Sequence, residues 1–256
     1  MGPHDTWFEF LPGYRALHEY LSGNMTRGWT WQMFQSTHFQ LDHVLGGLLV
    51  LIFLVFGAAR YARAVSGSGD AGLVPPATFG LRNLFEILAD VVYGLMAGVM
   101  PEKEARRFLP IIGTLFFFIL FSNLLALVPG LLPPTDTLKT NLALSLPVFL
   151  MAHFFGVREH GAKYFKHFLG PVWWLSWLML PIELVSHIAR PVSLAMRLLG
   201  NIVADHSVVL VFFGIFPLLL PLPFMVMGVF VSVVQAVVFS LLSTVYFAQA
   251  VAHEEH

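Results

Sequence analysis

The chain has 256 residues, of which 57% are hydrophobic and only 11% are charged, and its net charge is −1. Soluble domains carry charge on about a quarter of their residues, so this composition predicts an integral membrane protein with several spans. The near-neutral charge argues against nucleic acid as a partner, and no basic block changes that conclusion. Cysteine is absent, which excludes disulfide frameworks, thiolate metal sites and thiol catalysis.

The N-terminal segment, 1–40, is polar and aromatic and lacks the basic start, apolar run and cleavage site of a signal peptide. The first uncharged apolar run, 44–59, extends to a predicted helix at about 41–62, which is long enough to cross a membrane. We expect this first span to act as the insertion signal. The remainder, 41–256, is expected to form a single membrane domain.

The segment 79–100 places acidic and basic residues among regularly spaced apolar ones, and prolines flank it. This pattern predicts an amphipathic helix that lies at the membrane surface rather than crossing it. The next two uncharged segments predict helices at about 108–129 and 138–157, and a turn rich in proline and glycine separates them. These two helices are expected to form a transmembrane hairpin.

Prolines divide the C-terminal part into two further predicted helices, at about 171–216 and 224–252. At about 1.5 Å per residue their lengths would be roughly 69 and 43 Å. Both exceed a hydrocarbon core of about 30 Å, so both helices are expected to be strongly tilted. Pro181 and Pro191 either kink the first helix or divide it. The predicted fold is an all-α polytopic membrane protein with five membrane helices and one amphipathic surface helix.

Basic residues are divided unevenly between the two sides of this topology. One side carries nine of them: Arg60, Arg63, Arg82, Lys103, Arg106, Arg107, Arg158, Lys163 and Lys166. The other side carries Arg15, Arg27 and Lys139. Because short loops rich in Lys and Arg stay in the cytoplasm, the N-terminal segment is expected outside the cell and the C-terminus inside.

The predicted helix at 171–216 carries a polar stripe. On a helix that turns about 100° per residue, its members fall within roughly 120° of one another. They are Glu183, Ser186, His187, Arg190, Ser193, Arg197, Asn201 and Asp205. Arg197 cannot lose its proton, because the guanidinium pKa stays above about 12. Burying such a charge in a membrane costs roughly 2.5 to 17 kcal/mol, so we expect a functional role for it.

The stripe predicts a hydrated route for protons or other ions, because each group can hold or pass a proton where lipid cannot. The alternative is that its members pair as structural links, for example Glu183 with Arg190. His206 points to the other side of the helix. His153, in the predicted helix at 138–157, is more typical of a packing residue.

The segment PIELVSHIARPVSLAMRLLGNIVADH, 181–206, resembles the signature of the a subunit of F-type ATP synthases. Other similar segments are ILFSNLLALVPG at 119–130, LKTNLALSL at 138–146, REHGAKYFKHF at 158–168 and QAVVFSLLSTVYFAQA at 235–250. The resemblance covers most of the chain beyond residue 40. It implies a stator subunit through which protons reach a rotating c-ring, with two long tilted helices beside that ring.

The resemblance also implies roles for individual residues. Arg197 matches the family's essential arginine, which faces the carboxylate of each passing c subunit. Four residues match positions near the outer half-channel or beside the arginine: Asn201, Asp205, His206 and Gln235. Three match positions that line the inner half-channel: Glu183, Ser186 and Ser193. Gln235 is expected to hydrogen-bond toward Arg197, and the alternative is a buried amide that packs the two helices together.

The implied partners are the c-ring, the peripheral-stalk b subunits and membrane lipid. The implied location is the bacterial plasma (inner) membrane, with several passes. No cofactor, metal or catalytic site for bond chemistry is expected, since ATP would be made elsewhere in the assembly. The choice between H⁺ and Na⁺ and the size of the ring stay open.

One position departs from the family pattern. The family often pairs an ionisable residue at the position of His206 with another on the last helix, where this chain has Gly228. Asp205 stands where the family commonly has glycine. We therefore hypothesise that Asp205 and His206 together replace the usual pair between the two helices.

Two other classes of protein remain as alternatives. An independent secondary transporter or ion channel could use a similar stripe, although such folds tend to contain internal repeats, and the two halves of this chain are not alike. A membrane enzyme with haem or zinc is the other, since the chain has 11 His residues. It lacks the HExxH zinc motif, and its HEEH sequence belongs to the terminal tail.

Overall fold

The computed structural model describes residues 7–25, 41–66, 80–128, 130–161, 164, 176–215 and 221–251, and in these residues helices connected by turns are the regular secondary structure. The α-helices in these ranges are α1 (Tyr14–Met25), α2 (Asp42–Ser66), α3 (Leu81–Ala97), α4 (Glu102–Leu125), α5 (Leu138–His160), α7 (Ser176–Ile215) and α8 (Pro221–Val251). Two short 3-10 helices are η1 (Trp7–Phe10) and η4 (Pro134–Asp136). Five of the described helices are long and apolar enough to cross a membrane, namely α2, α4, α5, α7 and α8. The predicted all-α polytopic fold is confirmed.

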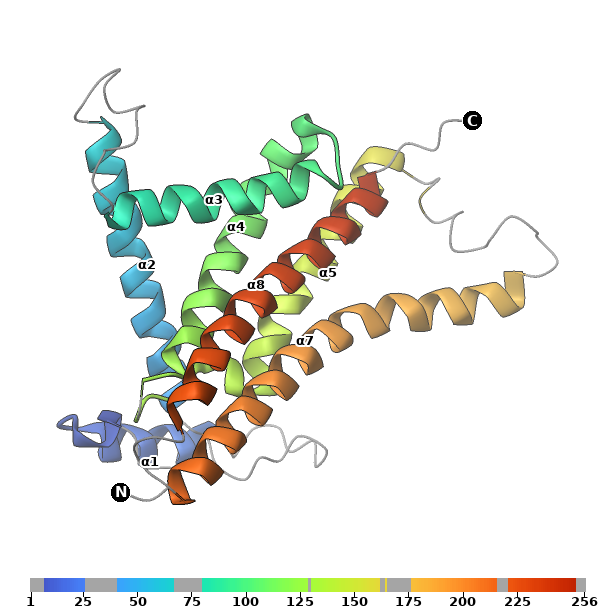
Figure 1. Ribbon diagram of the computed structural model, residues 1–256. Helices are drawn as coiled ribbons and strands as arrows, with labels where there is room; N and C mark the ends of the chain where they lie inside the picture. Colours follow the sequence, from blue (N-terminus) through green and yellow to red (C-terminus); the bar gives the residue numbers. More distant parts are fainter. Residues whose placement is uncertain are drawn as a thin grey trace.

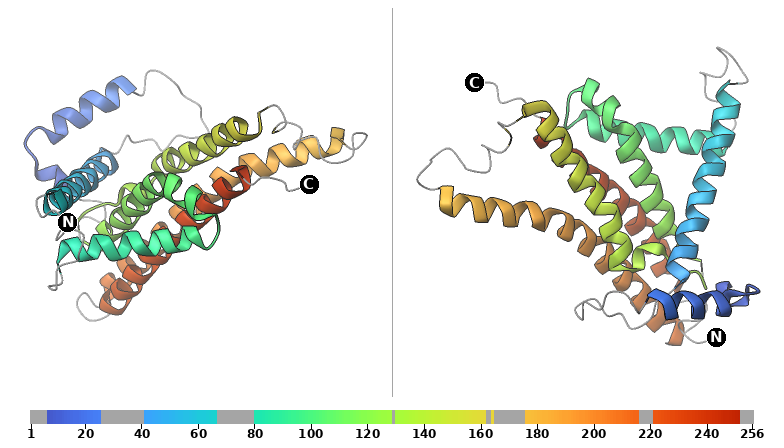
Figure 2. Two further views of the ribbon diagram at one scale, coloured as in Figure 1. Left: turned by 90° about the horizontal axis from the view of Figure 1, so that it is seen from above. Right: turned by 180° about the vertical axis from the view of Figure 1, so that it is seen from behind.

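The helices are arranged as a bundle with two crossing helices at its ends. Helix α8 packs against α4, α5 and α7, α5 also packs against α7, and α2 packs against α4 at one edge (Figure 1). Helix α3 lies across the bundle at one end, and α1 lies across it at the opposite end (Figures 1 and 2). A transverse α3 agrees with the amphipathic pattern that predicted a surface helix.

Two helices begin earlier than their hydropathy predicted. Helix α4 begins at Glu102 rather than near residue 108, because its first turns are polar but still helical. Glu102 and Glu104 lie in the first turn, where negative side chains stabilise the positive end of the helix dipole. Helix α8 begins at Pro221 rather than near residue 224. Proline fits the first turn of a helix, because the backbone N–H that it lacks would have no helical partner there.

Helix α7 is continuous through Pro181 and Pro191 over 40 residues. This length corresponds to about 60 Å, and the 31 residues of α8 correspond to about 46 Å. Figure 1 shows that α7 bends, with its first part lying flatter than its second. The two prolines therefore leave one bent helix, and the alternative of separate helices is wrong for this segment. The predicted ends at 171–175 and 216 lie outside the described residues.

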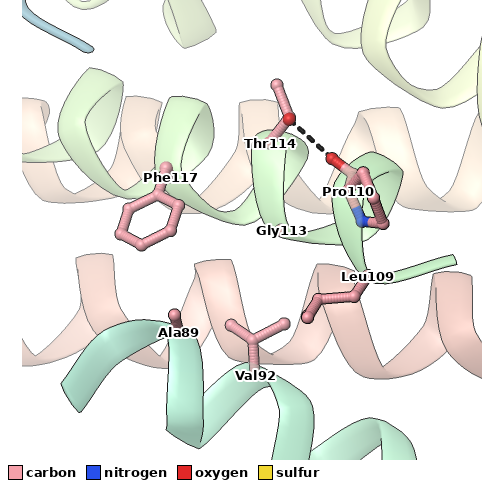
Figure 3. Close-up of a pocket in the computed structure, with 7 residues that line it drawn as sticks. All are labelled: Ala89, Val92, Leu109, Pro110, Gly113, Thr114 and Phe117. Atoms are coloured by element: carbon pink, nitrogen blue, oxygen red, sulfur yellow. Dashed lines mark hydrogen bonds between the residues drawn. The ribbon is translucent and has the colours of Figure 1, made fainter. Parts of the chain in front are cut away.

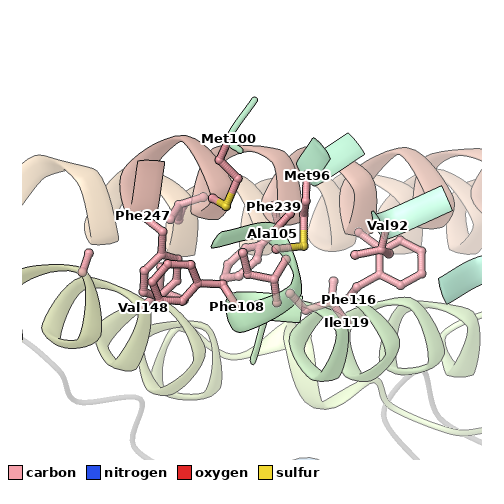
Figure 4. Packing of buried hydrophobic residues seen from close by; sticks show 14 of the residues in the cluster. Val92, Met96, Met100, Ala105, Phe108, Phe116, Ile119, Val148, Phe239 and Phe247 are labelled. Atoms are coloured by element: carbon pink, nitrogen blue, oxygen red, sulfur yellow. The ribbon is translucent and has the colours of Figure 1, made fainter. Parts of the chain in front are cut away.

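Aromatic side chains join three helices in the core, and Figure 4 shows two of them, Phe108 and Phe247. Phe108 on α4 stacks on Phe247 of α8 with ring centroids 4.7 Å apart. Phe155 on α5 meets the edge of Phe108 at 5.0 Å. Phe108 and Phe247 are fully buried, and such pairs contribute about 0.5 to 1.5 kcal/mol beyond their buried area. This contact fixes α4, α5 and α8 as the frame against which α7 packs.

A shallow apolar groove separates α3 from α4 (Figure 3). It is lined by Ala89, Val92, Leu109, Pro110, Gly113, Thr114 and Phe117. Pro110 has no N–H to donate to the preceding turn of α4, and the Thr114 hydroxyl donates a hydrogen bond to the Pro110 carbonyl at 2.6 Å. Nearby on α3, Arg82 and Glu86 form an ion pair at 2.9 Å.

The N-terminal segment contains a helix, α1, that its polar and aromatic composition did not predict. The Tyr14 hydroxyl donates a hydrogen bond to Asp42 Oδ1 at the start of α2, at 3.0 Å. The Trp7 backbone N–H donates to the Gly130 carbonyl at 3.0 Å. Gly130 has a positive φ of 86°, and a Cβ there would collide with the Trp7 indole. Long-range contacts with the loop after α4 and with α2 therefore position this segment.

Candidate ion-translocation site

The predicted polar stripe runs along α7. Ser186, Ser193, Arg197 and Asn201 have exposed side chains, while Glu183, Arg190 and Asp205 are half-buried. His187 lies at the edge of the stripe and is 8% exposed. His206 belongs to α7, but its side chain lies outside the described residues. The stripe thus borders the buried face of α7, and the side chains at its centre are exposed on the outer surface of the bundle.

Arg197 lies at this centre, opposite Gln235 of α8. The Gln235 Nε2 amide donates a hydrogen bond to the backbone carbonyl of Arg197 at 2.9 Å, and Gln235 is only 4% exposed. The expected bond toward Arg197 therefore reaches its main chain rather than its guanidinium. A buried cross-helix bond of this kind contributes about 0.6 to 2 kcal/mol in a membrane protein. It holds the arginine at a fixed height against α8 and leaves the guanidinium exposed.

The guanidinium of Arg197 has no anionic partner in the part of the chain that is described: the ion pairs found there join other residues. Large apolar side chains are exposed in the same stretches of α7 and α8 that carry Arg197 and Gln235. They are Val192, Met196 and Val203 on α7, and Phe230, Val233 and Val234 on α8. A permanent cation on an open apolar surface is costly in lipid, so the surface requires a partner that supplies an anion.

The structural alternative was that members of the stripe pair with one another. One such pair is present, but it is not the example of Glu183 with Arg190. Glu183 Oε1 instead lies 3.2 Å from His187 Nε2, one helical turn away. Arg190 places its guanidinium 5.3 Å from the ring centroid of Tyr246 on α8, in a cation–π arrangement. The ionisable residues at this end of the stripe are therefore divided between a carboxylate–imidazole pair and a cation held by an aromatic ring.

His153 of α5 lies beside this pair, a contact that sequence reasoning missed. Its ring centroid is 5.0 Å from that of His187, with the rings at 79°. The ring centroid of Tyr164, beyond the end of α5, lies 6.0 Å from that of His153. Burial raises the pKa of the Tyr164 hydroxyl, and the positive charge of Arg190 opposes that rise. Only the packing of α5 on α7 brings the two histidines together, and no local pattern in either segment signals it.

Asp205 lies farther along α7 than Arg197, and Gly228 lies on α8. Gly228 is buried, and a Cβ built on it would lie 2.9 Å from Leu127 Cδ2 of the segment after α4. Leu127 thus occupies the space that a side chain at position 228 would need. This packing is compatible with the hypothesis that the ionisable pair has moved to Asp205 and His206.

The fold and the site together define a class: an all-helical, multi-pass membrane protein with an ionisable stripe and an exposed arginine on a long tilted helix. The family model described as ATP synthase A chain matches residues 43–248. ATP synthase subunit a 1 of Syntrophotalea carbinolica is 50% identical over 210 residues, which cover 82% of this chain and 86% of the relative. ATP synthase subunit a of Bdellovibrio bacteriovorus is 43% identical over 232 residues, covering 90% and 100% respectively.

The chain therefore belongs to the ATP synthase A chain family, the a subunits of the F-type ATP synthase membrane sector. The resemblance inferred from the segment 181–206 is confirmed. The protein is a proton-translocating membrane subunit that works within a complex of other subunits.

Proposed function

We propose that this chain is the stator that provides two offset proton half-channels to the c-ring, and thereby couples ion flow to rotation and ATP synthesis. The observation that carries the proposal is the exposed Arg197, held through its backbone by Gln235 and without an anionic partner among the described residues. A rotating ring of carboxylates would supply that anion one subunit at a time.

The fixed charge of Arg197 has two effects in this proposal. It stabilises the ionised form of a nearby c-subunit carboxylate, so it lowers the pKa of that carboxylate and promotes release of its proton. It also repels protons that would pass directly from one half-channel to the other. A proton that moves down 100 mV releases about 2.3 kcal/mol, and this energy drives rotation only while the direct leak is closed.

The polar stripe extends from Arg197 in both directions along α7. Glu183 lies roughly 21 Å before it and Asp205 roughly 12 Å beyond it, at about 1.5 Å per residue. We assign Glu183, Ser186 and Ser193 to the inner half-channel. The outer half-channel, or the immediate surroundings of the arginine, comprises Asn201, Asp205, His206 and Gln235.

The proposed topology places the N-terminal segment, 1–40, outside the cell and the C-terminus in the cytoplasm of a bacterium, with the membrane domain 41–256 in the plasma membrane. The c-ring would cover the exposed faces of α7 and α8 around Arg197. The peripheral-stalk b subunits and lipid would cover other apolar surfaces. The subunit would carry ions without making or breaking covalent bonds.

The test is ATP-driven acidification of membrane vesicles that contain the whole complex, with and without sodium. We expect Arg197→Ala to abolish acidification while the complex assembles with its c-ring. Arg60→Ala is the matched control, because Arg60 is exposed on α2, which packs against α4 and η4 rather than beside the stripe. Full pumping by Arg197→Ala, or a purified complex without a ring of small subunits, would contradict the proposal and favour an independent transporter.

A further inference from the structure

The contact between α5 and α7 brings three titratable side chains into one cluster. His187 lies between the other two, with its Nε2 atom 3.2 Å from Glu183 Oε1 and its ring centroid 5.0 Å from that of His153. The two imidazole rings meet edge to face, at an angle of 79°. The cluster thus extends the polar stripe of α7 sideways onto a second helix.

The orientation of His153 favours proton exchange. Its Nδ1 atom lies 2.9 Å from the Phe149 carbonyl one turn earlier on α5. Because a carbonyl only accepts hydrogen bonds, Nδ1 carries the proton in the neutral ring, and a further proton must bind at Nε2. The backbone of α5 therefore sets the tautomer of His153.

Exposure is highest at Glu183, at one end of the cluster, and lowest at His187, in its middle. The Glu183 side chain is 34% exposed and the His187 side chain is 10% exposed. His153 is half-buried against α7. A proton can enter at the more accessible carboxylate and move onto imidazoles whose unperturbed pKa lies near neutral pH. Imidazole can take up a proton on one nitrogen and release one from the other, which is the property a relay needs.

The charged and polar neighbours limit how many protons the cluster holds. Arg190, on the same helix face, is cationic and is held over Tyr246 of α8. Tyr164, beyond α5, borders His153. A phenol is neutral at physiological pH, and the raised pKa of Tyr164 moves its ionisation further from that pH. Arg190 and a second imidazolium repel positive charge, while the Glu183 carboxylate attracts it. A second positive charge on the cluster is therefore disfavoured.

We propose that His153 is a proton-exchanging residue of the inner half-channel, which with His187 and Glu183 forms a relay across α5 and α7. This inference rests on the proposed stator function, because it supplies that half-channel with protons when few are free in solution. The cluster takes up one proton at one end and releases one proton at the other. Its net charge is therefore the same after each transfer as before it.

The test uses vesicles containing the membrane sector after removal of the catalytic sector, with a potassium diffusion potential that drives protons. The initial rate of proton conduction is measured between pH 6 and 9 for wild type, His153→Gln, His187→Gln and the double variant. We expect rates near wild type at pH 6. Above about pH 8 we expect each single variant to conduct at least about fivefold more slowly, because histidine buffers near neutral pH and glutamine does not.

The double variant should conduct no more slowly than the slower single variant, since groups in one relay act as a unit. Phe149→Leu is the matched control: it removes an aromatic ring 4.2 Å from the His153 ring but no titratable group. Its pH profile should match wild type. An equal change of profile in Phe149→Leu, or additive losses in the double variant, would assign the cluster to packing and overturn the relay.

Rates are normalised to the amount of assembled complex, so that impaired assembly is not read as slow conduction. His153→Ala with added imidazole gives a second readout, in which recovery of conduction above pH 8 supports the relay and absence of recovery contradicts it.

A wild-type profile for His153→Gln would overturn the relay alone, provided that Arg197→Ala still abolishes coupled pumping. Retained pumping by Arg197→Ala would instead overturn the stator function itself.

Discussion

Gln235 and Arg197 illustrate how single residues support the site. An arginine on a membrane helix has a long, flexible side chain, so its useful position depends on the backbone that carries it. The hydrogen bond from Gln235 to the Arg197 carbonyl fixes that backbone relative to α8 and leaves all the guanidinium donors available to a partner. The packing of α7 on α8 is thereby coupled to the height of the charge in the membrane.

Tyr14 gives a prediction at the residue scale, outside the membrane helices. Burial, together with its hydrogen bond to Asp42, raises the pKa of the Tyr14 hydroxyl above the usual value of about 10. A raised pKa in the folded state stabilises the fold below pH 10, and this contribution is lost as the pH rises further. We expect Tyr14 to remain protonated when exposed tyrosines ionise.

The measurement is the absorbance of phenolate near 295 nm, compared between wild type and Tyr14→Phe during titration from pH 9 to 12. The two curves should coincide up to about pH 11 if Tyr14 ionises late. Phenylalanine also removes one hydrogen bond, worth about 0.5 to 1.5 kcal/mol, or more because the acceptor is charged. A difference between the curves that develops around pH 10 would show that Tyr14 does not dock on Asp42 in the membrane-bound protein.

At the scale of elements, α2 is attached to the bundle by a close approach of its backbone. A Cβ on Gly46 would lie 2.9 Å from the Leu132 carbonyl oxygen, in the loop between α4 and α5. A backbone atom cannot rotate away as a side chain can. Glycine at this position therefore allows α2 to contact η4 and α4, although most of the helix faces outward.

Gly46→Ala is expected to loosen α2 and to lower the free energy of unfolding by about 1 to 3 kcal/mol, as overpacking generally does. Gly47→Ala is the matched control, since the nearest atom to a Cβ there is Pro134 Cβ at 3.7 Å, an ordinary contact. Thermal unfolding in detergent and protease sensitivity of α2 measure the effect. Equal stability of the two variants would show that the Gly46 contact does not determine how α2 docks.

At the scale of the whole molecule, the proposed outer half-channel combines residues of α7 and α8. Asp205→Gly is expected to abolish proton conduction if Asp205 and His206 replace the pair that other family members divide between the two helices. Gly228→Glu should restore conduction in the Asp205→Gly background, because it returns a carboxylate to α8. Leu127 must move for this side chain to fit, and its contact is the end of a flexible side chain.

Proton conduction is measured in vesicles for Asp205→Gly, for Gly228→Glu and for the double variant. Asp205→Gly with Gly228→Ala is the control, because alanine at position 228 displaces Leu127 without adding a titratable group. Restoration by glutamate but not by alanine is the expected result. Full conduction by Asp205→Gly alone would refute the hypothesis that Asp205 has taken over the missing role.

The amino-acid sequence by itself determined the class, the order of the helices and the place of the polar stripe. These features depend on composition, on runs of apolar residues and on spacing along one helix. They are local properties, because a bilayer requires each spanning segment to be an apolar helix that satisfies its own backbone hydrogen bonds. The signature at 181–206 identified the family for the same reason, because it lies within a single segment. Hydropathy misplaced the start of α4, since polar first turns are helical without being apolar.

The tertiary structure alone decided which atoms meet. It directed Gln235 to the backbone of Arg197 instead of its guanidinium, and it placed His153 beside His187 and Glu183. It also kept α7 as one helix through two prolines, which the sequence allowed but did not require. These outcomes depend on how helices far apart in sequence pack, and such long-range contacts leave no periodic pattern in either segment that takes part.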